Sequence, residues 1–369
     1  MSLAPVAPRL PAGLETPCLV VELDTVARNI SRMAEAAEAR GVRLRPHVKT
    51  HKSVRIAEMQ LAAGASGITV GTLGEAEVFA AAAIEDILVA YPIWAEGPKA
   101  ARVRALHDGL RRFAVGIDSI PGAERLAAAV AGAARPLHAL VEIDPGNRRT
   151  GVPPDRALDV ALAARSLGLV VDGVFCHGGH SYRGPDAVAA AAEDEIATLS
   201  LAVAGLRAAG FEAPVVSAGS TPTAVLAAAG EVTEIRPGTY VLGDRHQLAL
   251  GAAPPDGLAA WVAATVVSAS VDGQVVLDSG AKALTKDRAS YVEGHGYVAG
   301  YPKATIDRLA DYHGMTRIPP GSPAPALGEV VAVLPNHICP VVDLYDSFVA
   351  VRGGSVVGRW PVDARGRSG

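Results

Sequence analysis

The segment RPHVKTHK, residues 45–52, places two histidines and two lysines within eight positions. A lysine amine that loses its proton in a poorly hydrated site attacks carbonyl groups, so such a lysine can form a Schiff base. A single lysine at a strand end is more often a surface charge, and the case for chemistry therefore needs partners elsewhere. We predict Lys49, at the end of a strand, as a buried reactive amine. Lys52 falls at the expected start of the next helix and is predicted to be a solvated or phosphate-steering charge.

Two short loops supply the kind of backbone that binds phosphate. The sequences GSTPT and RPGTY each follow an expected strand, and small residues in such loops leave backbone N–H groups open to an anion. Either loop alone is weak evidence, because turns favour these residues anyway. Both together, opposite Lys49, favour pyridoxal phosphate as cofactor. The predicted phosphate residues are Gly219, Ser220, Thr221, Gly238 and Thr239.

A histidine and a cysteine two positions apart, His337 and Cys339, form a second candidate site in the sequence NHIC. On an extended segment their side chains would point to the same side. Imidazole and thiolate together favour zinc. A buried cysteine is commonly a small apolar residue, so the spacing alone favours ordinary packing over a metal site.

The elements that must position these residues alternate regularly between strand and helix patterns. Eight expected strands with helical crossovers are typical of a (β/α)₈ barrel, whose chemistry gathers at the carboxyl ends of the strands. An open doubly wound sheet is the competing architecture, and we favour the barrel because the pattern stops after eight strands. The expected strands are 42–48, 67–72, 86–92, 112–118, 137–144, 169–178, 213–219 and 234–241.

The pattern changes near Gly251, where period-two alternation and Gly-rich turns begin. The predicted fold class is therefore α/β, a barrel over residues 24–250 followed by a β-rich domain over residues 251–369. We expect the first strand, residues 18–23, to join the β-rich domain. That domain carries the His337 and Cys339 motif.

Composition narrows the cellular setting. The 369 residues are 50% hydrophobic with a net charge of −4, which argues against non-specific nucleic-acid binding. The three cysteines are scattered, as suits a reducing compartment. The N-terminal residues lack the pattern of a secretory signal, and no apolar run approaches the length of a membrane span. We therefore expect a cytoplasmic protein without nucleic-acid or membrane partners.

Together, LRPHVKTHKS, GSTPT, RPGTY and NHIC resemble the D-serine dehydratase and D-threonine aldolase family over nearly the whole chain. These enzymes bind pyridoxal 5'-phosphate on an alanine-racemase-like barrel and carry a C-terminal β-domain. The resemblance implies that Lys49 holds the cofactor, with the two loops around its phosphate. It also assigns Arg149 to the cofactor side and His177 to the neighbourhood of the pyridine ring, with Tyr182 in the same loop.

The resemblance further implies a divalent metal on His337 and Cys339, zinc foremost and manganese second, with water and substrate completing its shell. His313 matches a family histidine that we count among the catalytic candidates. Tyr312 is a departure, because relatives often have an acid there. With the cofactor on Lys49, we expect Arg45, His47, Lys49 and His51 to line or flank its cradle.

The activity implied is β-elimination from a D-3-hydroxy amino acid, with D-serine giving pyruvate and ammonia. Retro-aldol cleavage to glycine and an aldehyde is the alternative: Cys339 resembles the dehydratase branch, whereas LDSGAKAL resembles the aldolase branch. A non-catalytic cofactor carrier would lack the β-domain and metal motif. A racemase would need a second base, for which no motif is found. Fold relatives are typically dimers, so a homodimer is expected.

Overall fold

The computed structural model describes residues 4–369, which form two compact units. The first, here called the β-unit, comprises residues 4–31, 50–53 and 239–365. The second, the barrel unit, comprises residues 32–49, 54–238 and 366–369. Along the chain, most of the barrel unit is thus inserted between residues 4–31 and 239–365 of the β-unit, and only residues 50–53 and 366–369 depart from this order.

Eight parallel strands build the barrel unit in the order β2-β9-β8-β7-β6-β5-β4-β3. A parallel bridge from His47, which follows β2, to Thr69 of β3 joins the two ends of this order. The α/β barrel expected from the alternating pattern is confirmed. The strands are β2 (Arg43–Leu44), β3 (Ile68–Val70), β4 (Asp86–Pro92), β5 (Arg112–Ile117), β6 (His138–Ile143), β7 (Val170–Cys176), β8 (Val215–Ala218) and β9 (Glu234–Ile235).

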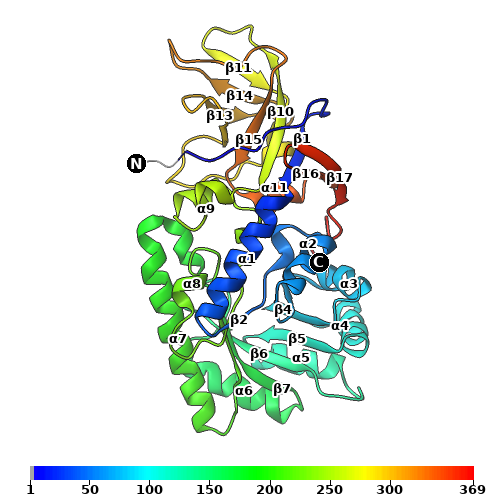
Figure 1. The fold of residues 1–369 in the computed structure, drawn as a ribbon. Helices are drawn as coiled ribbons and strands as arrows, with labels where there is room; N and C mark the ends of the chain where they lie inside the picture. The colour runs from blue at the N-terminus through cyan, green and yellow to red at the C-terminus, as the bar shows by residue number, and fades with distance from the viewer. Residues whose placement is uncertain (1–3) are drawn as a thin grey trace. The chain divides into compact units, whose positions relative to one another are not determined.

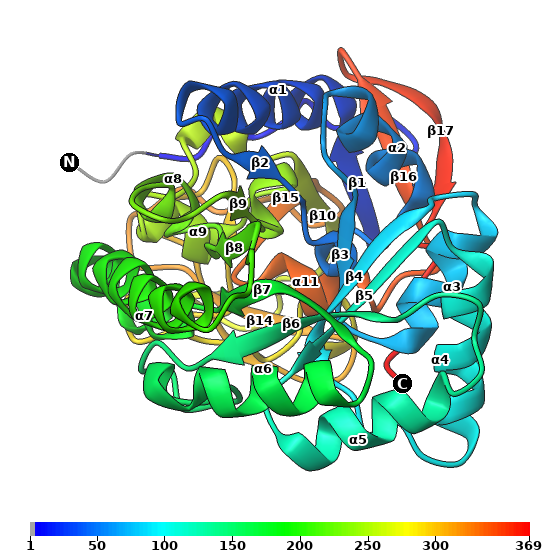
Figure 2. The same ribbon diagram turned by 90° about the horizontal axis from the view of Figure 1, so that it is seen from below.

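Helices surround these strands, as the view in Figure 2 shows. Side chains fix several helix starts: Thr72 accepts the N–H of Glu75 at 3.1 Å, and Ser119 accepts that of Gly122 at 3.3 Å. The helices are α1 (Leu23–Ala39), which begins in the β-unit, α2 (Val54–Ala62), α3 (Leu73–Ala81), α4 (Pro98–Gly109), α5 (Ile120–Ala129), α6 (Ala157–Ser166), α7 (Val188–Ala208) and α8 (Ala224–Ala227).

The barrel interior holds an apolar layer from five strands. Phe175 is its largest member, and a Cβ on Gly116 would lie only 2.7 Å from the Phe175 ring. Glycine on β5 therefore leaves the room that the ring occupies. The layer consists of Leu88, Ala114, Leu140, Phe175 and Val215.

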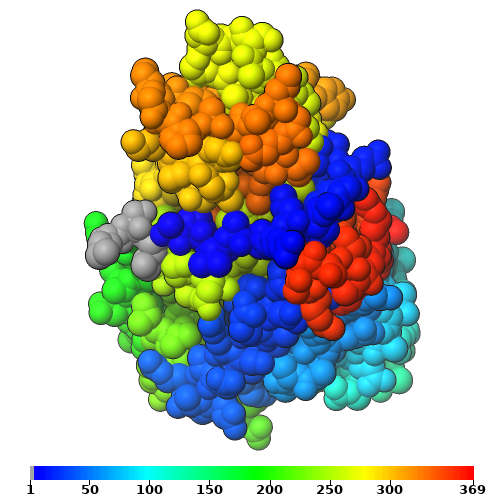
Figure 3. Space-filling model, turned by 45° about the horizontal axis from the view of Figure 1, so that its top comes forward, coloured from blue at the N-terminus to red at the C-terminus, as the bar shows by residue number. Residues whose placement is uncertain are grey.

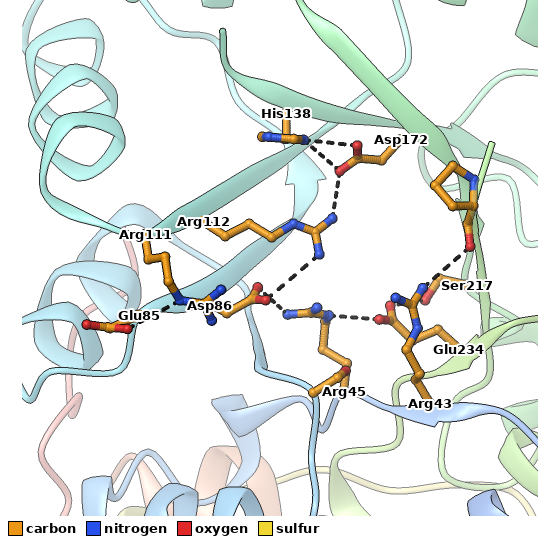
Figure 4. A network of polar contacts seen from close by, with 12 residues as sticks. Arg43, Arg45, Glu85, Asp86, Arg111, Arg112, His138, Asp172, Ser217 and Glu234 are labelled. Atoms are coloured by element: carbon orange, nitrogen blue, oxygen red, sulfur yellow. Dashed lines mark hydrogen bonds and ion pairs between the residues drawn. The ribbon is translucent and has the colours of Figure 1, made fainter. Parts of the chain in front are cut away.

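A charged network lies where several of these strands begin (Figure 4). Arg45 bonds Asp86 through Nη1 at 2.7 Å and Glu234 through Nε at 2.9 Å. Arg112 bonds Asp172 at 2.6 Å, and His138 Nδ1 lies 2.9 Å from the same carboxylate. Buried charges are stable only when paired in this way. The network therefore closes the amino-terminal end of the barrel.

The network corrects one expectation. Arg45 was predicted to line or flank the cofactor cradle with His47. Its guanidinium instead lies at the opposite end of the barrel, where it pairs with Asp86 and Glu234. Residues two apart on a strand face the same side but differ in height by roughly 7 Å, so Arg45 lies a layer below His47. Its long side chain reaches the strand starts.

The β-unit is built on a nine-stranded sheet, in the order β11-β14-β13-β12-β15-β10-β1-β16-β17, with β11 also paired to β10 (Figure 1). The β11–β10 pairing closes six antiparallel strands into a small barrel. β1 runs antiparallel to β10 and parallel to β16. The last strand, β17, is exposed and appears red in Figure 3, whereas its hairpin partner β16 is largely buried.

The elements of the β-unit are mostly short strands. The strands are β1 (Cys18–Glu22), β10 (Ala260–Ser268), β11 (Gln274–Leu277), β12 (Gly296–Val298), β13 (Thr305–Leu309), β14 (Gly314–Arg317), β15 (Val330–Pro335), β16 (Ser347–Arg352) and β17 (Ser355–Pro361). Its helices after β9 are α9 (Arg245–Ala249), α10 (Ala281–Leu284) and α11 (Ile338–Val342). Among residues 4–369, no helix has the length and apolarity needed to span a bilayer.

Replacing Arg45 tests the charged network. Arg45→Met leaves Asp86 and Glu234 without their buried cation, so we expect a loss of about 3–5 kcal/mol in the free energy of unfolding. Urea denaturation measures this loss. Arg111→Met is the matched control: its ion pair with Glu85 is 66% and 64% exposed, and a change below about 1 kcal/mol is expected. Equal stability of the two variants would contradict the assignment.

Candidate functional site

Lys49 lies in a short 3₁₀ helix, Val48–Thr50, immediately after the bridged residue His47. Its side chain is exposed, whereas the sequence predicted a buried amine. The reason is that the strand stops earlier than expected, at Leu44 with a single bridge at His47, and the chain then turns. The Lys49 amine remains in electrostatic reach of His47 and His177, because its charge lowers the pKa of both.

His47 and His177 are neutral imidazoles in this setting. Burial is the largest cause that lowers the pKa of each well below 6.5, and the charges of Lys49, Arg149 and Arg236 lower both further. A neutral imidazole offers one donor and one acceptor nitrogen. His177 follows β7, as the sequence predicted, and can therefore hydrogen-bond a ligand without adding positive charge.

Arg236 is a site residue that the sequence reasoning missed. It follows β9, is only 6% exposed, and donates through Nη2 to the carbonyl of Cys176 at the end of β7. Its Nη1 is buried without a hydrogen-bond partner among residues 4–369. A buried guanidinium nitrogen lacking an acceptor is costly, so Arg236 is suited to an anionic or acceptor ligand. Its place as the first residue of RPGTY, within the expected strand 234–241, was the available signal.

Arg149 lies in the loop after β6, with its side chain half exposed. Its Nη2 is 3.6 Å from Glu142 Oε1, which also accepts the Thr150 hydroxyl at 2.8 Å. Burial raises the pKa of Glu142, while Thr150 and Arg149 oppose that shift. The second oxygen of Glu142 is buried and has no partner in the described chain. Arg149 and Arg236 thus share a neighbouring carboxylate.

The loop after β8 is less open to phosphate than predicted. The Gly219 N–H donates to Glu195 at 3.0 Å, and the Ser220 N–H donates to the Thr223 hydroxyl at 3.0 Å. A Cβ on Gly219, whose φ is +87°, would lie 2.9 Å from the Cα of Ala224. Glycine is therefore required by the loop itself. The Ser220 hydroxyl is engaged as well, because it lies 3.1 Å from the Thr223 hydroxyl and 3.4 Å from the Ser181 hydroxyl. The phosphate role of Ser220 and Thr221 stays a prediction.

The second predicted loop follows β9. Gly238 is buried there, next to Pro237, whose carbonyl accepts the His47 N–H at 3.0 Å. Thr239 begins a short 3₁₀ helix of the β-unit, Thr239–Val241. The Thr239 hydroxyl lies 3.7 Å from the Cys339 sulfur, so the Thr239 side chain contacts the candidate metal pair of His337 and Cys339.

The remaining candidates near the barrel site in the sequence are Tyr182, His51 and Lys52. Tyr182 is partly buried in the 3₁₀ helix Gly179–Arg183. His51 is buried, and its Nδ1 accepts the Ser53 N–H at 3.1 Å. Lys52 was predicted to be solvated or phosphate-steering, which is wrong: it is only 7% exposed and bonds Asp343 at 2.7 Å. A buried ammonium needs such a carboxylate.

His337 and Cys339 come together as predicted, though not on an extended segment. His337 precedes α11 with extended backbone, and Cys339 lies in its first turn. The two side chains hydrogen-bond each other. Asp287 Oδ2 lies 2.7 Å from His337 Nδ1, which leaves Nε2 as the nitrogen available to a metal. The Thr50 hydroxyl lies 3.2 Å from the Cys339 sulfur.

The donor set fits a divalent ion with open positions. Burial lowers the pKa of His337, but Cys339, Asp244 and Asp287 outweigh it and raise that pKa to about 10. A metal would therefore displace a proton from the ring. Among residues 4–369, no three His, Cys, Asp or Glu side chains converge as ligands. Imidazole plus thiol, backed by a carboxylate, is chemistry that suits zinc.

His313 lies on the exposed turn between β13 and β14. The neighbouring Tyr312 is 62% exposed, and its hydroxyl accepts a hydrogen bond from Lys282 at 2.9 Å. The tyrosine that departs from the family pattern thus has a partner of its own. The catalytic role of His313 stays a prediction.

Pyridoxal phosphate fits the residues at the carboxyl ends of the barrel strands. They offer an accessible amine at Lys49, neutral imidazoles at His47 and His177, and an unpartnered buried donor at Arg236. The cationic side chains suit a dianionic phosphate.

Comparison with known proteins agrees with this geometry. The alanine racemase N-terminal domain model matches residues 21–246, and a serine dehydratase domain model matches residues 259–351. The chain is 36% identical to D-threo-3-hydroxyaspartate dehydratase of Delftia sp. (strain HT23) over 94% of this chain and 97% of that one. The chain belongs to the D-serine dehydratase and D-threonine aldolase family.

Other members of the D-serine dehydratase and D-threonine aldolase family extend the comparison. The solved Delftia dehydratase superposes with a TM-score of 0.88 at 35% identity, covering 95% of this chain and 97% of that one. D-threonine aldolase of Arthrobacter sp is 33% identical over 97% of this chain and 94% of its own. A cysteine-to-alanine mutant of the Delftia enzyme, in the metal-free form, has a TM-score of 0.87 at 35% identity, with 95% and 97% coverage.

Removing Asp287 tests the metal pair. Asp287→Ala deprives His337 of the carboxylate that orients its ring, so we expect zinc affinity to fall about 10- to 100-fold. Competition with a chromophoric chelator measures the affinity. Asp307→Ala is the control, because the Asp307 carboxylate is exposed and pairs with Arg317 at 2.8 Å instead of with His337. Unchanged zinc affinity in the Asp287 variant would show that the ion is held elsewhere.

Proposed function

We propose that the protein is a pyridoxal-phosphate- and metal-dependent lyase that removes the hydroxyl group of D-3-hydroxy amino acids by β-elimination. The observation that carries this proposal is the convergence of His337 and Cys339, with Asp287 behind the imidazole. Elimination has to expel a poor leaving group, and a Lewis-acid ion assists that departure. D-Serine, giving pyruvate and ammonia, is the simplest substrate, and D-3-hydroxyaspartate is suggested by the Delftia relative.

The barrel residues have distinct roles in this proposal. Pyridoxal phosphate, when bound, supplies an electron sink for the carbanion at the substrate α-carbon. Lys49 Nζ would hold the cofactor and would accept the α-proton of the substrate. His177 is neutral and hydrogen-bonds near the ring, with Tyr182 in the same loop. Arg236 and Arg149 supply positive charge, and the hydroxyls of Ser220 and Thr221 with the Gly238 loop hold phosphate.

The metal pair has one role, which is to hold the substrate hydroxyl. His337 Nε2 and the Cys339 thiolate would bind the ion, with zinc preferred over manganese because of the thiolate. The proton on the His337 ring is the competitor, so the ion is held less firmly as the pH falls. His313 is retained as a further catalytic candidate.

Retro-aldol cleavage is the second candidate reaction, and the 33% identity to D-threonine aldolase favours it. In that reaction the hydroxyl proton is removed and the Cα–Cβ bond breaks, giving glycine and an aldehyde. Both reactions need the same cofactor and ion. Cys339, where aldolases often have an acid, leads us to prefer elimination. We also propose a cytoplasmic homodimer, on the basis of the family resemblance.

Reduction with borohydride tests the assignment of Lys49. Wild-type protein incubated with pyridoxal phosphate and reduced should carry one phosphopyridoxyl group on Lys49, located by peptide mass spectrometry. Lys49→Ala should carry none at the site. Lys52→Ala should still be labelled at Lys49, because Lys52 is occupied by Asp343. Label on Lys52 in the Lys49 variant would overturn the assignment.

A substrate assay tests the reaction itself. D-Serine, D-threonine and D-threo-3-hydroxyaspartate are supplied separately, and 2-oxo acids, ammonia, glycine and aldehydes are scored. We expect 2-oxo acid and ammonia, with loss of activity by orders of magnitude on chelation or in Cys339→Ala. Cofactor content should be unchanged in both cases. Glycine as the main product would establish the aldolase reaction, and full metal-free turnover would remove the metal role.

A further inference from the structure

Glu195, the acceptor of the Gly219 N–H, is a fully buried carboxylate on α7. Its Oε1 accepts two backbone N–H groups, from Gly178 at 2.8 Å and from Gly219 at 3.0 Å. The Cys176 thiol lies 3.6 Å from the same oxygen. One oxygen therefore ties together the loops that follow β7 and β8.

These two loops carry the proposed cofactor residues. Gly178 follows His177 directly, and Gly219 precedes Ser220 and Thr221. A shift of either backbone N–H moves its neighbouring side chain with it. Their common acceptor thus sets the position of the ring-side imidazole relative to the phosphate-side hydroxyls.

The backbone is fitted closely to this carboxylate. A Cβ on Gly178 would lie 2.7 Å from the carboxyl carbon of Glu195 and 2.8 Å from Oε2. Any other residue at position 178 would push Glu195 away. Gly219 adopts a φ of +87°, which aims its N–H at Glu195 while the chain turns toward Ala224.

The charge of Glu195 has a second neighbour in Arg236. That guanidinium is buried among Cys176, Glu234, Glu195 and Glu142, and the carboxylates favour its charged form against burial. Glu195 Oε2 is itself buried without a partner within the described residues. The Glu195 carboxylate thus accepts the two N–H groups and places negative charge near the Arg236 guanidinium.

We propose that Glu195 is a positioning residue for the cofactor, which sets the loops after β7 and β8 through its shared Oε1. This inference rests on the proposed cofactor site. It predicts that the acceptor oxygen is required for cofactor affinity. Glu195→Gln retains an oxygen at the same place, whereas Glu195→Leu removes the acceptor from two buried N–H groups.

The full-length protein is titrated with pyridoxal phosphate, and bound cofactor is followed by absorbance and by visible circular dichroism. We expect Glu195→Leu to bind at least tenfold more weakly than wild type, with an altered circular dichroism band. Glu195→Gln should stay within about threefold. Gly178→Ala, which displaces the carboxylate without removing it, should resemble the leucine variant and serves if that variant does not fold.

Glu193→Leu is the matched control, since it lies exposed on the same helix and should bind as wild type does. Thermal unfolding of the cofactor-free variants separates stability from affinity. Wild-type affinity and spectrum in Glu195→Leu or Gly178→Ala would overturn the inference. A loss in Glu195→Gln as large as in Glu195→Leu would do the same. Failure of the wild type to bind the cofactor would instead refute the proposed function.

Discussion

Buried positive charge is the constraint on which the barrel unit depends. At the amino ends of the strands, Arg45 is matched by two carboxylates at hydrogen-bonding distance. At the carboxyl ends the matching is looser, because Arg236 keeps an unpartnered nitrogen within the described chain and Arg149 is 3.6 Å from its acid. The two ends of one barrel thus differ in how far their charges are neutralised.

The two ends are suited to different functions for this reason. A network whose charges are all paired stabilises the amino end of the barrel without a ligand. At the cationic end, burial and then the neighbouring positive charges lower the pKa of His47 and His177. The same charges favour an anion such as a phosphate group. The same barrel can therefore be stabilised at its amino end and bind a ligand at its carboxyl end. The chemistry of barrels of this type usually lies at the carboxyl ends of the strands.

Sequence reasoning went furthest where a local pattern determines a local structure. The strand 86–92 was predicted to the residue. The spacing of His337 and Cys339 was enough to place the two side chains together, but their metal role came from the family resemblance and stays a prediction. It failed where partners are distant in the sequence. Asp287 lies 50 positions before His337, and Arg236 is recognised only once β7 and β9 are placed together. The prediction for Arg45 was wrong because alternation shows which face of a strand a residue lies on, but not how far along the barrel axis its long side chain reaches.

The insertion of the barrel unit into the β-unit has a consequence for synthesis of the chain. β1 is made early, but its neighbours β10 and β16 come much later, with Cys18 paired to Ala263 and Val20 to Val349. As the chain leaves the ribosome, the barrel strands β2 to β9 are all complete before β1 has a sheet to join. The apolar segment CLVV therefore has no strand partner until β10 has been made, and an unpaired apolar strand of this kind is prone to aggregate in a nascent chain.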